Sequence, residues 1–164
     1  MIALGIDPGT AICGYGFVET RGSRLVPLAY GSIFTTPDMP MEQRLMKIFD
    51  ELDALIKQHK PDVMGVEKLF FSRNVTTAIP VGQARGVVLL AAAKNGLRLV
   101  ERTPMQIKQD VTGYGKATKN QVIYMVTKLL HLPKPPKPDD TADALAIAIC
   151  TTYCLRSVAW RNSL

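Results

Sequence analysis

The stretch Ile2-Ala3-Leu4-Gly5-Ile6-Asp7-Pro8-Gly9-Thr10 places an acidic residue at the end of a short apolar segment. Its large apolar residues alternate with small ones, and this period of two predicts a β-strand that ends at Asp7. Pro8-Gly9 then predicts a sharp turn. A strand, an acid and a glycine-containing turn can frame a metal ion or a phosphate, since a buried carboxylate without a partner is costly. Alternatively, Asp7 accepts hydrogen bonds within its own turn.

The segments after this strand predict an α/β domain. Alternating patterns indicate four further strands, at Cys13–Glu19, Leu25–Thr35, Val63–Glu67 and Leu97–Glu101. Periodicity and capping motifs predict five helices: one over Leu45–Ile56, one from about Ile79 to Lys94, two that begin at Thr103–Gln106 and Thr118–Gln121, and one from about Asp139 towards Tyr153. Pro133–Pro138 is predicted to be a stiff, extended connector. We therefore expect a single domain over residues 1–164, with a mixed five-stranded sheet flanked by α-helices.

The composition is that of a basic globular protein. The 164 residues include 20 basic and 14 acidic side chains, and the net charge of +6 favours an anionic partner. The three cysteines, Cys13, Cys150 and Cys154, have no paired spacing, which predicts reduced thiols and a cytoplasmic location. No signal peptide and no membrane-spanning segment is expected.

Three further carboxylates are predicted to join Asp7. Glu67 ends a strand that is expected to lie parallel beside the first, so both acids would reach the same edge of the sheet. Alternatively, Glu67 is solvated or pairs with Lys68. Asp140 and Asp143 are three residues apart and share one face of the last helix. Asp143 lies among apolar residues and therefore needs a charged or metal partner.

Asp139, in contrast, has a structural explanation as the residue that caps this helix. Clustered carboxylates repel one another unless a cation is present, and Mg²⁺ and Mn²⁺ prefer such oxygen ligands. Without Asp7, Glu67, Asp140 and Asp143, the 20 basic residues face only 10 of the 14 acidic ones, which suits a phosphodiester substrate. Two metal ions about 3.5–4 Å apart can activate water and stabilise the leaving oxygen of such a substrate. We expect two Mg²⁺ ions per site, with Mn²⁺ as a substitute.

Four motifs occur along the chain in a recognisable order. They are Gly5-Ile6-Asp7-Pro8-Gly9, Val66-Glu67-Lys68-Leu69-Phe70, Gly82-Gln83-Ala84-Arg85-Gly86 and Asp140-Thr141-Ala142-Asp143-Ala144-Leu145-Ala146. Together they resemble the bacterial RuvC-type Holliday-junction resolvases of the ribonuclease H-like superfamily, from residue 2 to about residue 155. The resemblance implies a ribonuclease H-like fold, a homodimer, and cleavage of four-way DNA junctions with Mg²⁺ or Mn²⁺. By motif position, Asp7, Glu67, Asp140 and Asp143 match the catalytic, metal-binding carboxylates, whereas Asp139 is additional.

The resemblance also implies contacts with DNA. Phe70 matches an aromatic residue that stacks on a base at the opened centre of the junction. Lys108 and Lys119 match basic residues near the scissile phosphate. Further cations are predicted to contact phosphates on charge alone, namely Arg73, Arg85 and Lys116.

The predicted function is that of a structure-selective endonuclease in recombination and repair. Two subunits would bind one junction and nick two opposing strands, leaving 5′-phosphates and 3′-hydroxyls. The helix with Gly82–Ala93 resembles the dimer-forming element of the family, although it could also be plain core. The family further implies branch-migration motor proteins as partners. The alternatives are a non-catalytic junction-binding protein, another ribonuclease H-like nuclease, and a sugar-kinase-like or actin-like ATPase with Asp7-Pro8-Gly9-Thr10 as its phosphate loop.

Overall fold

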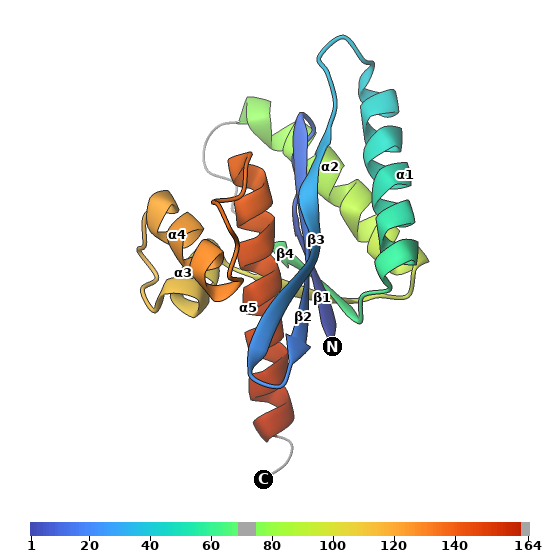
Figure 1. The fold of residues 1–164 in the computed structure, drawn as a ribbon. Coiled ribbons are helices and arrows are strands. Elements are labelled where there is room, and N and C mark those ends of the chain that lie inside the picture. Colours follow the sequence, from blue (N-terminus) through green and yellow to red (C-terminus); the bar gives the residue numbers. More distant parts are fainter. Residues whose placement is uncertain (69–74, 162–164) are drawn as a thin grey trace.

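A mixed five-stranded β-sheet forms the centre of the molecule, as the sequence predicts (Figure 1). The computed structural model describes residues 1–68 and 75–161. The sheet has the order β3-β2-β1-β4-β5, with strands at Ile2–Asp7 (β1), Ile12–Arg21 (β2), Arg24–Phe34 (β3), Val63–Glu67 (β4) and Arg98–Arg102 (β5). β1 pairs antiparallel with β2 and parallel with β4. The carboxyl ends of β1 and β4 therefore meet at one edge of the sheet.

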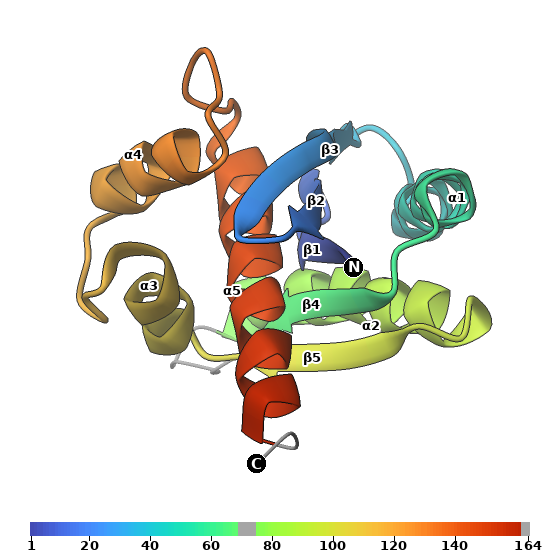
Figure 2. The same ribbon diagram turned by 60° about the horizontal axis from the view of Figure 1, so that its bottom comes forward.

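Helices cover both faces of this sheet (Figure 2). Their bounds are Met41–His59 (α1), Val75–Lys94 (α2), Pro104–Thr112 (α3), Lys119–Leu129 (α4) and Asp139–Arg161 (α5). α1 and α2 pack on one face, and α5 packs on the other with α3 and α4 beside it. α3 and α4 each begin at a capping box, on Thr103 and Thr118 respectively, as their sequences predict.

Large residues point to one face of β1 and small residues to the other. This difference determines how closely a helix can pack on each face of the sheet. Leu4 and Ile6 are fully buried in the core with α1 and α2. Gly5 points the other way, and a Cβ added there would collide with the backbone of Ala144 and Ala148 on α5. The glycine therefore lets α5 lie directly on the sheet backbone. Asp7 follows Gly5 on the same face of β1, which directs it towards this helix.

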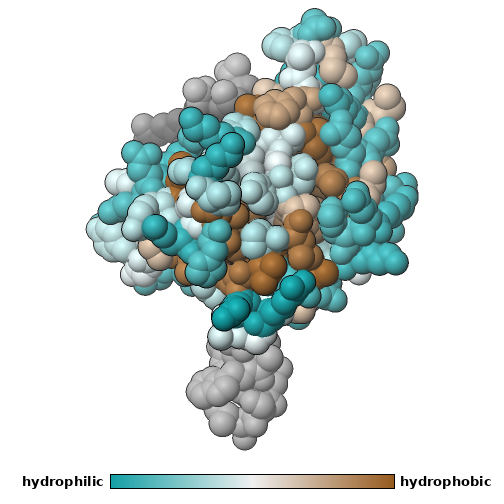
Figure 3. All heavy atoms as spheres, viewed as in Figure 1, coloured by the Kyte–Doolittle hydropathy of each residue, from teal (hydrophilic) through white to brown (hydrophobic). Residues whose placement is uncertain are grey.

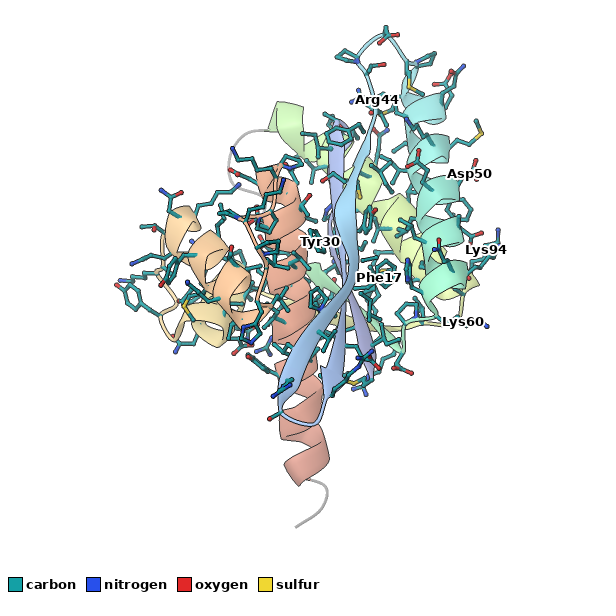
Figure 4. All side chains as sticks on the ribbon, viewed as in Figure 1. Phe17, Tyr30, Arg44, Asp50, Lys60 and Lys94 are labelled. Atoms are coloured by element: carbon teal, nitrogen blue, oxygen red, sulfur yellow. The ribbon has the colours of Figure 1, made fainter. Side chains whose placement is uncertain are left out.

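Aromatic side chains make contacts on the face of the sheet that α1 and α2 cover. Phe17 on β2 is fully buried and points towards α1, where its ring centroid lies 4.6 Å from that of His59 (Figure 4). Lys94, the last residue of α2, lies over the ring of Phe49 on α1 at 4.9 Å. The first contact ties the end of α1 to the sheet, and the second ties the end of α2 to α1.

The surface is mixed in character. On the face shown in Figure 3, hydrophilic side chains cover α1, and hydrophobic ones gather towards the middle over the sheet. The exposed apolar residues of β3 are Leu28, Tyr30 and Phe34. In the ranges 1–68 and 75–161, no helix has both the length and the apolar character needed to cross a membrane.

The start of α2 was predicted wrongly. The helix begins at Val75, not near Ile79, and it continues through Pro80. Its first turn contains two threonines, whose β-branched side chains have low helix propensity. Such propensities are weak and do not exclude a helix.

Two smaller differences concern β5 and the proline-rich connector. β5 spans Arg98–Arg102, one residue later than the predicted Leu97–Glu101, and the other strand bounds agree within two residues. The connector between α4 and α5 bends at residues 133–134 and 137–138, so the prediction of an extended path is wrong. Figure 2 shows it as a loop that projects beyond α4 and α5.

Candidate active site

Three of the predicted carboxylates line one cavity of about 340 Å³. Asp7 ends β1 and Glu67 ends β4, and the parallel register pairs Ile6 with Val66. Both acids therefore leave the sheet at the same edge. Asp143 reaches the cavity from α5. The expected meeting of two strand ends with the last helix is thus present in the structure.

The remaining walls of this cavity are mostly apolar. They consist of Pro104 and Ile107 from α3, Val122 from α4, and Ala146 and Ile147 from α5, together with Lys108 and Lys119. Apolar walls lower the local dielectric, which strengthens every charge interaction inside the cavity. The sequence did not predict these walls, because helical periodicity indicates only that such residues are buried.

α5 reaches the end of β1 because Gly14 removes a side chain from its path. Gly14 on β2 lies opposite Asp7 in the antiparallel register, and a Cβ there would collide with the backbone carbonyl of Asp140. The first turn of α5 is also fixed laterally, since the hydroxyl oxygens of Ser32 and Thr141 are 2.8 Å apart and share a hydrogen bond. The sheet thus determines where the acids at the start of α5 lie.

The electrostatic environment of Asp7 is strongly acidic. Burial, followed by the negative charges of Asp143, Asp140 and Glu67, raises the pKa of Asp7 to about 7, against a smaller opposing effect of Lys119. Asp7 is therefore only partly ionised at neutral pH. The cluster needs additional positive charge to ionise fully.

Two lysines supply part of this charge. The Nζ of Lys119 lies 3.2 Å from Asp143 Oδ2 and 3.3 Å from Asp139 Oδ2. Partial burial disfavours its charged form, but hydrogen bonds to both carboxylates outweigh this and raise the pKa of Lys119. Burial raises the pKa of Asp143, which Lys119 partly offsets. Burial and Asp143 likewise raise the pKa of Glu67, and here Lys108 provides the opposing positive charge.

Asp140 and Asp139 differ in their positions. Asp140 is half-buried and its charge acts on Asp7, although its side chain does not line the cavity. Asp139 is exposed and pairs with Lys119. This pairing had no signal in the sequence, where Asp139 was explained as a helix cap and Lys119 as a phosphate contact.

The donor set has the chemistry that a divalent metal requires, but not yet the arrangement. Carboxylate oxygens are the preferred ligands of Mg²⁺ and Mn²⁺, and the raised pKa values of Asp7, Glu67 and Asp143 indicate an excess of negative charge. Within the described residues, however, no group of three or more His, Cys, Asp or Glu side chains is arranged to hold a metal ion. Asp143 is paired with Lys119 instead. By their chemistry, the carboxylates therefore fit a divalent metal ion.

The residues predicted to contact DNA lie in several places. Lys108 and Lys119 line the carboxylate cavity. Lys116 instead lines a separate cavity of about 520 Å³. Arg85 is mostly buried and forms an ion pair with Glu101, so its prediction as a free phosphate contact is not supported. The predictions for Phe70 and Arg73 fall outside the described residues.

Comparisons with known proteins agree on one family. The family model described as "Crossover junction endodeoxyribonuclease RuvC" matches residues 3–151. A protein of that name from Heliobacterium modesticaldum is 56% identical over 160 residues, which cover 98% of this chain and 97% of the relative. Another from Desulfitobacterium hafniense is 59% identical and covers 93% of both chains. The solved structure of Thermus thermophilus RuvC in complex with Holliday junction substrate matches with a TM-score of 0.91 at 35% identity, over 96% of each chain.

Proposed function

This chain belongs to the RuvC family of crossover junction endodeoxyribonucleases, and we propose that it cuts DNA at the cavity lined by Asp7, Glu67 and Asp143. It is a structure-selective endonuclease that resolves four-way DNA junctions in homologous recombination and repair. This assignment replaces the ATPase alternative for the turn after Asp7. The observation that carries the proposed site is the convergence of three acids and two lysines on one cavity.

The proposed cofactor is Mg²⁺, with Mn²⁺ as a substitute and two ions per site. Asp7, Glu67, Asp140 and Asp143 would hold it, with Asp7 at the centre because its pKa responds to all three of the others. When bound, such ions activate water and stabilise the leaving oxygen of a phosphodiester, giving 5′-phosphate and 3′-hydroxyl ends.

The protein's own cations complete this centre. Lys119 would place positive charge near the phosphate as negative charge develops on its oxygens. Lys108, whose charge already acts on Glu67, would place a second positive charge near the phosphate from α3. The walls of Ile107, Val122 and Ile147 would limit the access of bulk water and strengthen these interactions.

We further propose that two copies pair through α2. Five of the exposed positions in the described part of α2 follow one another at intervals of four and three residues and form a single stripe, here called the α2 stripe: Ile79, Gln83, Gly86, Leu90 and Ala93. Ile79 and Leu90 are 61% and 59% exposed and give this one stripe two large apolar side chains. A symmetric pair of stripes would bury these residues and provide the two active sites that paired nicking requires.

Three further parts of the proposal rest on the family resemblance or, for Arg73 and Lys116, on charge alone. Phe70, Arg73 and Lys116 are proposed to contact junction DNA, together with Lys108 and Lys119. Branch-migration motor proteins are proposed as partners. A cytoplasmic location is supported by the DNA substrate and by the buried thiols of Cys13 and Cys150.

The deciding experiment measures nicking of a synthetic four-way junction with Mg²⁺. We expect Asp7→Asn to reduce the cleavage rate by about 10²–10³-fold or more, because transition-state charge would lose its stabilisation. Junction binding, measured by gel shift without metal, should persist in this variant. The cleavage rates of a linear DNA duplex and of an RNA–DNA hybrid, measured in the same way, serve as controls for junction selectivity.

Each alternative predicts a different result. Undiminished cutting by Asp7→Asn would remove this site from the mechanism. Tight binding without any cutting by the unaltered protein would indicate a non-catalytic junction-binding protein. Preferred cutting of the hybrid would indicate a different ribonuclease H-like nuclease.

A further inference from the structure

A buried polar network lies behind α3, outside the carboxylate cavity. One oxygen of Asp110, Oδ2, accepts two hydrogen bonds: from Arg102 Nη2 at 2.9 Å and from the thiol of Cys150 at 2.8 Å. Cys150 is fully buried, and the side chains of Arg102 and Asp110 are about three-quarters buried. A single carboxylate oxygen therefore joins the end of β5, helix α3 and helix α5.

Helices α3 and α5 each carry a residue of the carboxylate cavity, and β5 lies beside the strand that carries Glu67. Arg102 pairs with Glu67 in the parallel register, and its carbonyl accepts a hydrogen bond from the backbone N–H of Lys68 at 2.8 Å. α3 contributes Lys108, two residues before Asp110. α5 contributes Asp143, which lies seven residues before Cys150 and so on the same face of the helix, about 10 Å away along its axis.

The chemistry of the network favours a fixed geometry. Partial burial disfavours the charge of Arg102, but hydrogen bonds to Cys150 and Asp110 outweigh this and raise its pKa. Burial, together with the carboxylate of Asp110, raises the pKa of the Cys150 thiol to about 12, so the thiol remains a hydrogen-bond donor at working pH. Charge-assisted bonds of this kind are among the stronger ones in proteins.

No other contact of this type holds α3 in the described part of the chain. The other side-chain hydrogen bonds of this helix are made within α3 itself or with the turns next to it. Its core contacts, through Ile107 and Val111, are apolar and non-directional. The link through Asp110 is therefore the directional side-chain contact that joins α3 to β5 and α5 among the described residues.

We propose that Asp110 is a positioning residue for junction cleavage, which fixes α3 so that Lys108 faces Glu67 in the carboxylate cavity. This rests on the proposed function of the carboxylate cavity. Asp110 does not line that cavity and would not touch the reacting phosphate. Its effect on the rate passes through Lys108.

The test is a double-mutant cycle measured by single-turnover cleavage of a junction with saturating Mg²⁺. We expect Asp110→Asn to reduce the cleavage rate by about ten- to a hundredfold, the scale of a small misplacement in an active site, while the dissociation constant for junction changes less than about twofold. Lys108→Ala should also reduce the rate. In the Lys108→Ala background, Asp110→Asn should have almost no additional effect, because the group that it positions is gone.

Two further variants separate positioning from a general loss of structure. Asp53→Asn is the matched control, since Asp53 is also a buried acceptor that joins elements, through Lys57 and Asn95, but lies with α1 away from the cavity. It should lower the melting temperature without changing the cleavage rate. Cys150→Ser keeps a donor and should cleave at nearly the normal rate, whereas Cys150→Ala should be slower.

The outcomes distinguish a failure of this proposal from a failure of the proposed function. Equal fold losses from Asp110→Asn in both backgrounds would overturn it, as would an unchanged rate in the single variant. If the unaltered protein does not nick junctions, the proposed function fails instead.

Discussion

Asp7 holds a proton in the folded chain over a pH range in which an unfolded chain releases it. Burial and the neighbouring carboxylates raise its pKa to about 7 from the ordinary value of 3.8. Between these two values the folded state binds more protons than the unfolded state, so this residue makes stability fall as the pH rises. Above pH 7 the ionised side chain destabilises the metal-free fold, and a bound cation would remove this penalty.

This predicts that Asp7→Asn stabilises the metal-free protein at alkaline pH. In EDTA at pH 8 the variant should melt about 2–6 °C higher than the unaltered protein, and the difference should shrink towards pH 4. Differential scanning calorimetry across this range measures it. Asp50→Asn is the control, because Asp50 is an exposed acid on α1 (Figure 4).

The effect of added Mg²⁺ on the melting temperature tests the role of Asp7 in a second way. It should raise the melting temperature of the unaltered protein at pH 8 and have little effect on Asp7→Asn, since a ligand stabilises only the form that binds it. A melting temperature of Asp7→Asn that equals the unaltered value at every pH would contradict the acidic environment described for Asp7.

The site could be predicted from the sequence where each residue has a local signal. Asp7 and Glu67 end recognisable strands, and Asp143 interrupts an apolar helix, so their meeting at one cavity follows from the fold class. The pairing of Lys119 with Asp139 and the network around Asp110 could not be predicted. Both depend on how α3, α4 and α5 pack against one another. This packing produces no periodic pattern or motif spacing in the sequence.

At the scale of elements, the contact between β1 and α5 leaves no space for a side chain at Gly5. Gly5→Ala would place a methyl group against the backbone of α5, which cannot move aside as a flexible side chain would. We expect a loss of about 1–3 kcal/mol or more in the free energy of unfolding, measured by urea denaturation. The loss would come with lower nuclease activity, because α5 carries Asp143.

Gly82→Ala is the control for this change. Gly82 lies inside α2 with open space around the position of an added Cβ. Alanine should therefore be neutral there or stabilise the helix by about 0.5–1 kcal/mol. Equal destabilisation by both variants would show that close packing at Gly5 is not the cause.

The strands and most helices could be predicted because their signals are local. Period-two alternation gave β1 and β4 with their observed bounds, and the capping boxes at Thr103 and Thr118 marked the starts of α3 and α4. The start of α2 was missed because its first turn has weak propensity and no apolar period. The path of the proline-rich connector was also missed, since prolines restrict the backbone but do not decide where it bends.

At the scale of the whole molecule, the α2 stripe predicts the oligomeric state. Leu90→Glu should convert a dimer into a monomer in sedimentation velocity, because two buried like charges would face each other across the symmetry axis. The monomer should keep its fold, as Leu90 is 59% exposed in the single chain. Paired nicking of a junction should then be lost.

Leu28→Glu is the matched control, since Leu28 is exposed on β3 and lies outside the stripe. It should leave the sedimentation coefficient unchanged. A Leu90→Glu protein that still sediments as a dimer would place the interface elsewhere on the surface.

The packing of α5 on β1 also has a consequence for how the cell makes this nuclease. A ribosome completes the whole sheet before it reaches the helix that carries Asp140 and Asp143. A nascent chain, or a fragment released early from a damaged message, has the strand acids but lacks the helix that completes their set. We therefore expect a chain that ends before α5 not to cut DNA, because it lacks Asp140 and Asp143 of the proposed centre.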